Sequence, residues 1–166
     1  PLGEVKITKK VNSILIVLRM NTDIEIWDQN RKRLFEYPKI EYTKRSLNSL
    51  IRSIKFLKNK HPNINVKAII INDNSSTENL NIIKKVIHGN NIDIINLDYS
   101  KYKKKISAQK NKETFANLAS LLQSFEIGKD TGEDLIYFIE DDYLHFEPML
   151  EEMVASYQRI ASQINK

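Results

Sequence analysis

The sequence contains no cysteine, which excludes a disulfide framework and a thiolate metal site. It has only four glycines, and none lies between Gly3 and Gly89, so the glycine-rich, basic first loop of a nucleotidyltransferase is missing. No apolar run approaches the ~20 residues needed to span a bilayer. No signal-peptide pattern opens the chain. These absences favour a cytoplasmic protein, with membrane association left open for a longer form.

The composition predicts one folded domain. The chain has 166 residues, of which 41% are hydrophobic and 28% are charged, and this length suffices for one core. Residues 4–166 are expected to form that domain, since Pro1-Leu2-Gly3 resembles the remnant of a protease-cleavage site. The net charge of +5 permits an anionic partner such as a nucleotide, a nucleic acid or a lipid headgroup. The basic run at 101–105 is typical of a solvated loop.

Apolar patterning predicts an α/β fold. Short runs rich in Ile and Val are typical of strands buried on both faces, and they lie at 14–18, 66–71, 92–97 and 135–139. Apolar residues at helical spacing follow each run, within residues 43–62, 75–90, 111–130 and 148–164. This alternation predicts a mainly parallel sheet with flanking helices.

Local signals refine the ends of these helices. Ser75 and Glu78 have the spacing of a capping box, and Gly89 is suited to the end of the same helix. The apolar repeat of the third helix stops before Gly128. Residues 21–41 are long for a connection after a strand, contain the single Trp, and could hold a short hairpin or a functional loop.

Polar side chains follow the predicted strands. In open parallel sheets, ligands bind beyond the carboxyl ends of the strands, at a switch point in strand order. The residues at these ends are Arg19, Asn21, Thr22 and Asp23; Asn72, Asp73, Asn74 and Ser75; Asp98 and Tyr99; and Glu140, Asp141 and Asp142. We expect them to converge on one rim of the sheet, where acids imply either solvation or a bound cation.

The acid triplet Glu140-Asp141-Asp142 lies directly behind an apolar strand. Side chains alternate along a strand, so Glu140 and Asp142 are expected to share one side, with Asp141 opposed. A divalent cation would neutralise the three acids, and Mg²⁺ usually needs only one or two carboxylates plus substrate phosphates. A polar turn that caps the next helix stays open as the alternative.

Asp73 ends another predicted strand. Its carboxylate can accept a hydrogen bond from a ring N–H such as that of uracil. The surrounding "NDNSS" is also a good turn and cap sequence, so a turn alone is the default interpretation of these residues.

Three segments together resemble one enzyme family. They are "INDNSSTEN" at 71–79, "QKNKETFANLASLL" at 109–122 and "YFIEDDYLHFEP" at 137–148. The combination resembles the nucleotide-binding half of GT-A-fold glycosyltransferases, the family 2-like group in particular, over roughly residues 12–160. In that family the first segment is a "DDxS" type turn, here with Asn72 in place of the first acid. The third segment contains the family's DxD motif, here in the form EDD.

The resemblance implies a GT-A, Rossmann-like nucleotide-binding domain and a role for each acid of the triplet. Asp142 would ligate Mn²⁺ or Mg²⁺ bound to the diphosphate of the donor. Asp141 would support the metal or the donor ribose. Glu140 would face the sugar.

The resemblance also implies a binding site for the rest of a nucleotide-sugar donor. Asp73 would bind the base, with uracil favoured, so the expected donor is a UDP-sugar. Arg19 and Asn21 would line the base and ribose pocket, and Lys110 or Asn111 would reach the phosphates. The acceptor stays open among glycan, lipid and protein, and no nucleic acid is expected as a partner.

A complete GT-A enzyme continues well past the DxD strand. That continuation supplies the acceptor site and, in inverting members, the general base, whereas this chain stops after one helix. We therefore expect a truncated, donor-binding domain that need not turn over by itself. His145 and Glu147 lie near the motif, and His145 is by default an exposed or supporting residue.

Other functions stay open. A nucleotidyltransferase also uses a metal and a nucleotide, but the missing glycine-rich loop argues against it. A non-enzymatic domain could bind anionic partners through its basic surface, although the lone "KYKKK" cluster is a weak signal for nucleic acid. A response-regulator receiver needs an acid pair after the first strand, where this chain has Arg19 and Met20.

Overall fold

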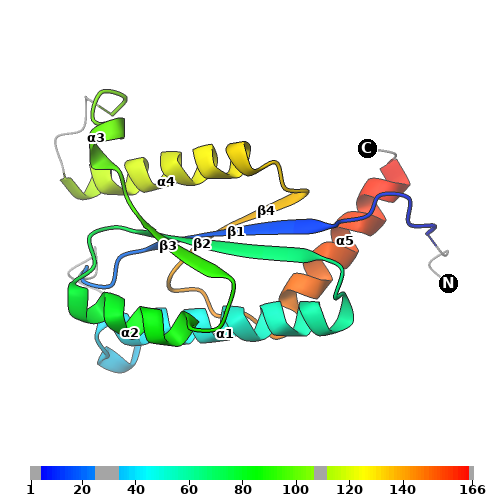
Figure 1. Ribbon diagram of the computed structural model, residues 1–166, viewed down its shortest axis with the longest axis horizontal. Helices are drawn as coiled ribbons and strands as arrows, with labels where there is room; N and C mark the ends of the chain where they lie inside the picture. The colour runs from blue at the N-terminus through cyan, green and yellow to red at the C-terminus, as the bar shows by residue number, and fades with distance from the viewer. Residues whose placement is uncertain (1–4, 25–33, 107–111, 165–166) are drawn as a thin grey trace.

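The computed structural model describes residues 5–24, 34–106 and 112–164, which form a sheet between two layers of helices (Figure 1). In this part of the chain the strands are β1 (Ser13–Met20), β2 (Asn65–Asn72), β3 (Ile92–Asn96) and β4 (Leu135–Glu140). The helices are α1 (Lys39–Lys60), α2 (Thr77–Ile87), α3 (Tyr99–Tyr102), α4 (Lys112–Thr131) and α5 (Met149–Ile164), and η1 (Leu34–Glu36) is a 3₁₀ turn. The alternation of strands and helices expected from the apolar pattern is confirmed.

The sheet has the order β3-β2-β1-β4, and all neighbouring strands are parallel. β1 pairs with β2 from Ser13 opposite Asn65 to Met20 opposite Asn72. On its other side β1 pairs with β4, which places Arg19 opposite Glu140. The chain thus moves outward from β1 to β3 and returns to β4 on the far side of β1. This reversal is typical of Rossmann-like folds, and it creates a switch point between β1 and β4.

The core has one layer on each face of the sheet. Alternate residues of β1 point into opposite layers, as strand geometry requires. Ile14, Ile16 and Leu18 pack in the layer that contains α1, α2 and α5, whereas Leu15 and Val17 pack in the layer of α3 and α4. All five side chains are buried. Burial on both faces explains why the sequence of β1 is apolar almost without interruption.

A stripe of buried serines joins α1 to the connection after β4 and to the start of α5. The Oγ of Ser49 accepts the backbone N–H of His145 at 3.0 Å, and the Oγ of Ser53 accepts that of Leu150 at 3.1 Å. Ser46 is buried on the same stripe. These short side chains let the connection lie against the helix, and they fix its backbone just beyond the acid triplet.

The predicted cap of α2 is wrong by one residue. The N-cap is Ser76, whose Oγ accepts the N–H of Asn79 at 3.4 Å. Ser75 accepts the N–H of Thr22 at 3.1 Å instead. Ser75 therefore ties the loop after β1 to the loop after β2, a long-range contact that the local capping pattern does not contain.

Other departures from the predicted elements have local causes. α4 continues through Gly128 to Thr131, and a Cβ added at Gly128 would lie only 3.0 Å from the ring of Phe138. The glycine permits close packing of the helix on β4 rather than ending the helix. α3 has only four residues, too few for an apolar repeat. The hairpin considered within 21–41 falls largely on residues 25–33, outside the described residues, and 34–36 form η1.

Removal of the Leu47 side chain tests the core under α1. Leu47 is fully buried, so Leu47→Ala is expected to lower the free energy of unfolding by about 2–5 kcal/mol, because it loses apolar contacts and leaves a cavity. The matched change Leu144→Ala removes an exposed side chain and should alter that free energy by less than about 0.5 kcal/mol. Urea denaturation followed by circular dichroism measures both values. Equal losses in the two variants would contradict the packing described here.

Candidate functional site

A pocket of about 470 Å³ opens at the carboxyl ends of β1, β2 and β4, at the switch point of the sheet. Its lining includes every sequence-predicted site residue that the structure describes, namely Arg19, Asn21, Asp73, Glu140, Asp141 and Asp142. The other two, Lys110 and Asn111, lie outside the described residues. Residues that are far apart in the sequence therefore meet in one place, as the strand-end pattern predicts.

Arg19 and Glu140 form an ion pair across neighbouring strands. They are opposite each other in the register of β1 and β4, and the Nη2 of Arg19 donates to the Oε1 of Glu140. The Nη1 of Arg19 also donates to the Oδ1 of Asn117 at 2.6 Å, which holds the guanidinium against α4. The first acid of the triplet is thus neutralised by the strand beside it.

Asp141 is buried and faces α1. Its Oδ1 lies 2.8 Å from the Nζ of Lys39, and its Oδ2 accepts a hydrogen bond from the hydroxyl of Thr43 at 2.8 Å. Burial raises the pKa of Asp141, and the charge of Lys39 and the Thr43 hydroxyl act in the opposite direction. Both carboxylate oxygens therefore already have protein partners, and this arrangement suits a supporting role better than direct contact with a ligand.

Asp142 is the most open acid of the triplet, with a side chain that is 54% exposed. Its Oδ2 lies 3.8 Å from the Nζ of Lys39. The expectation that Asp142 shares a side with Glu140 is wrong, because β4 ends at Glu140 and the strand alternation stops there. Asp142 lies instead with Asp141, beside Lys39.

Two cations thus separate the three acids, Arg19 on one side and Lys39 on the other. Lys39 was not predicted. Nothing in its sequence surroundings distinguishes it from the other basic residues, because its role arises only when the start of α1 meets the end of β4. No group of three or more His, Asp or Glu that could hold a metal ion occurs among the described residues.

Asp73 lies at the end of the pocket formed by β2. Its Oδ1 accepts the hydroxyl of Tyr99, and its Oδ2 lies 3.4 Å from the Nδ2 of Asn21. Burial, together with the Asp73 carboxylate, raises the pKa of Tyr99, so its hydroxyl stays protonated and donates. The ring of Tyr99 stacks on Phe115, with centroids 6.1 Å apart. This packing fixes the direction of the Asp73 carboxylate.

Asp23 holds the loop that follows β1. It accepts hydrogen bonds from the N–H of Ser76 at 2.6 Å, the hydroxyl of Ser76 at 3.1 Å and the Nδ2 of Asn79 at 2.8 Å. Burial alone would raise the pKa of Asp23, but these bonds and the Thr22 hydroxyl together lower it. Asp23 is therefore an anchor at the N-terminus of α2, which also favours the negative charge.

His145 lies behind the pocket rather than in it. Its Nδ1 is 3.3 Å from the Oγ of Ser49, and its Nε2 is 3.3 Å from the hydroxyl of Tyr137. Burial lowers the pKa of His145, so the ring is neutral at pH 7. Its position agrees with a supporting residue, and Glu147 is exposed beyond it and does not line the pocket.

The pairing of Lys39 with Asp141 can be tested through the pH dependence of stability. A carboxyl group with a raised pKa holds its proton more tightly in the folded state, so its contribution to stability falls as the pH rises above the ordinary value of 3.8. Lys39→Met removes the compensating cation. We expect it to cost about 3–5 kcal/mol near pH 7 and much less near pH 4, where Asp141 is protonated.

Urea unfolding at the two pH values measures these losses. Lys44→Met is the matched control, because Lys44 lies on the same helix and pairs with a partly exposed Glu41 at 2.7 Å. This control should lose little at either pH. A Lys39→Met penalty that does not change with pH would sink the assignment.

No protein family, curated protein or solved structure matches the sequence or the fold at a significant level. In the described part of the chain, no helix is long and apolar enough to cross a membrane. The function is therefore inferred from the pocket itself.

Proposed function

We propose that this pocket binds the nucleoside diphosphate of a nucleotide sugar, with UDP as the favoured nucleotide, and that the domain is the donor-binding part of a GT-A-type glycosyltransferase. The observation that supports this most is the meeting of Asp73, Arg19 and the acid triplet at one switch point. These residues come from three strands and line one pocket. A volume of about 470 Å³ is within the usual range for small-molecule sites.

In this proposal, the pocket would hold a divalent cation whose coordination shell is completed by the substrate. Within the described part of the chain, Asp142 is the acid of the triplet with no hydrogen bond to either carboxylate oxygen, because Glu140 binds Arg19 and the oxygens of Asp141 are engaged by Lys39 and Thr43. A single carboxylate is enough for Mg²⁺ or Mn²⁺ when phosphate oxygens and water supply the other ligands. When bound, the cation would stabilise negative charge on a departing diphosphate.

Lys39 and Arg19 add positive charge on both sides of Asp142. Each is already paired with an acid. These pairs hold the two cations in place, so that a diphosphate bound together with its metal ion would meet fixed positive groups without further rearrangement. Glu140, oriented by Arg19, would face the sugar.

Asp73 is proposed to recognise the base. Its carboxylate accepts from Tyr99 and Asn21, and a carboxylate has further lone pairs for a third donor. The N3–H of uracil is such a donor, whereas cytosine has no hydrogen at that nitrogen. The base-binding end of the pocket, at Asp73, would thus prefer UDP over CDP.

Calorimetric titration with UDP tests the proposal. Wild-type protein should bind UDP in the presence of Mn²⁺, and Asp142→Asn should weaken that binding by at least about tenfold, because the amide is a poor ligand for a hard cation. Asp93→Asn is the matched control: it removes an exposed carboxylate on β3, paired with Lys67 at 3.5 Å, away from the pocket. It should leave UDP binding unchanged.

Absence of UDP binding with and without Mn²⁺, in protein that melts cooperatively, would refute the donor-binding proposal. Binding that is the same in wild type and Asp142→Asn would keep the nucleotide site but remove Asp142 as the metal ligand.

Base selectivity tests Asp73 separately. Wild-type protein should bind UDP more tightly than CDP, and Asp73→Asn should reduce that preference by about tenfold or more, the usual cost of losing a hydrogen bond to a charged acceptor. The ratio of the two dissociation constants is the readout, so a general loss of affinity cannot imitate the effect. An unchanged ratio would exclude base recognition by Asp73.

A further inference from the structure

Large apolar side chains are exposed on the face of the molecule that carries α1. Leu144 and Phe146, in the connection between β4 and α5, are 72% and 84% exposed. Phe35 and Tyr37, just before α1, are 65% and 48% exposed. Single exposed apolar residues are common in proteins, but a group of four beside one helix is a candidate interaction surface.

The same face is basic. No acid occurs from residue 42 to residue 72, and this stretch contains Lys44, Arg45, Arg52, Lys55, Lys58, Lys60 and Lys67. On α1, Arg45, Arg52 and Lys55 are exposed and recur at helical spacing, so they share the outward side of the helix. Among the described residues, neither Arg52 nor Lys55 has an ionic partner.

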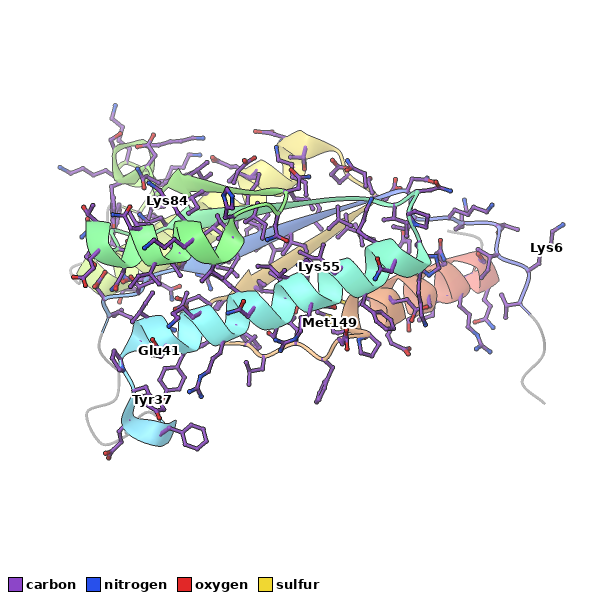
Figure 2. All side chains as sticks on the ribbon, turned by 60° about the horizontal axis from the view of Figure 1, so that its bottom comes forward. Lys6, Tyr37, Glu41, Lys55, Lys84 and Met149 are labelled. Atoms are coloured by element: carbon purple, nitrogen blue, oxygen red, sulfur yellow. The ribbon has the colours of Figure 1, made fainter. Side chains whose placement is uncertain are left out.

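One basic side chain of this face contacts an aromatic one, and the exposed connection lies beside the same helix. The guanidinium of Arg45 lies 5.1 Å from the centre of the Tyr37 ring. The hydrogen bond from the backbone of His145 to Ser49 places Leu144 and Phe146 next to the middle of α1. Figure 2 shows the connection from β4 to α5 running alongside α1, with Tyr37 near the start of that helix and Lys55 farther along it. We call this group of seven side chains the α1 face: Phe35, Tyr37, Arg45, Arg52, Lys55, Leu144 and Phe146.

We infer that the α1 face docks on an anionic lipid bilayer. Basic side chains beside exposed aromatic and aliphatic ones match both parts of a membrane surface, since the cations meet anionic headgroups while the apolar tips enter the acyl boundary. Tyr37 is suited to the interface, because its ring is apolar and its hydroxyl can stay hydrated. The apolar side chains have two exposed acids as sequence neighbours, Glu36 and Glu147, and the three cations of the α1 face outnumber them.

A lipid surface fits this face better than a nucleic acid does. Leu144 and Phe146 project from a connection whose backbone is anchored to buried serines, so their exposure is not a result of a loosely held loop. Leu144 can neither stack on a base as an aromatic ring does nor form hydrogen bonds. Insertion into an acyl layer would bury both apolar side chains away from water.

The inference does not depend on the nucleotide proposal, because none of the residues of the α1 face lines the pocket. The two sites are nonetheless neighbours, since Asp142 of the pocket is only two residues from Leu144. Docking of the α1 face would hold the mouth of the pocket close to the bilayer surface.

Vesicle co-sedimentation of the full chain tests the inference. The protein should bind vesicles made of equal parts phosphatidylcholine and phosphatidylglycerol at about 0.1 M salt, and binding should weaken as salt is added. Vesicles of phosphatidylcholine alone should bind far less. Arg52→Gln with Lys55→Gln should weaken binding roughly 25-fold, which is about fivefold for each cation removed.

Two further double variants complete the experiment. Leu144→Ser with Phe146→Ser should reduce binding to the anionic vesicles without changing the melting temperature, because both side chains are exposed. Lys103→Gln with Lys104→Gln is the charge-matched control: both lysines are exposed after α3, on the opposite side of the sheet, and should leave binding unchanged.

Three results would overturn the inference. They are no binding to the anionic vesicles, an equal loss in the Lys103 and Lys104 control, and no loss in the Leu144 and Phe146 variant. A DNA or RNA oligonucleotide that binds more tightly than the vesicles, and is released by Arg52→Gln with Lys55→Gln, would also overturn it and assign the face to nucleic acid.

Discussion

Burial of β1 on both faces is the constraint on which the rest of the structure depends. The side chains of β1 are apolar on both faces of the sheet, so each face needs a layer of helices. The chain supplies α1, α2 and α5 on one face and α3 and α4 on the other. Parallel neighbours on both edges of β1 then bring the carboxyl ends of β2 and β4 to the same rim as its own. The pocket exists at that rim because every loop after a strand must leave the sheet there.

The strands and their order along the chain could be predicted, because burial on both faces produces short apolar runs in the sequence. The apolar runs place every strand end within two residues, since a strand buried on both faces has few polar positions. The predictions of helix ends and caps fail where a contact with a residue distant in the sequence determines the role of a side chain. Gly128 is typical of a helix end by its type, yet it lies inside α4, where its missing Cβ leaves room for the ring of Phe138. Ser75 has the local spacing of a cap, yet its hydroxyl is taken by Thr22, more than fifty residues away in sequence.

The same distinction applies to the pocket. Its acids could be located because strand ends converge on one rim, whatever the details of packing. Their partners could not, because Lys39 reaches Asp141 only through the placement of α1 against β4. The three adjacent negative charges are tolerated through two protein cations, so the triplet is stable before any ligand arrives. What the pocket presents to a ligand is therefore one open carboxylate, Asp142, in a partly neutralised setting.

The serine stripe of α1 holds the backbone next to the triplet through bonds that do not depend on the acidic side chains. The segment after the triplet is anchored through two backbone N–H groups, that of His145 in the connection and that of Leu150 at the start of α5, and these bonds do not involve the acids. Glu140, at the end of its strand, is likewise positioned by the β1 ladder. Exchanges at Asp142 can thus change the ligand preference of the rim while the scaffold around it stays the same. Residue 142 can therefore be exchanged without a change of the scaffold, which makes this position the natural starting point for redesign of the pocket.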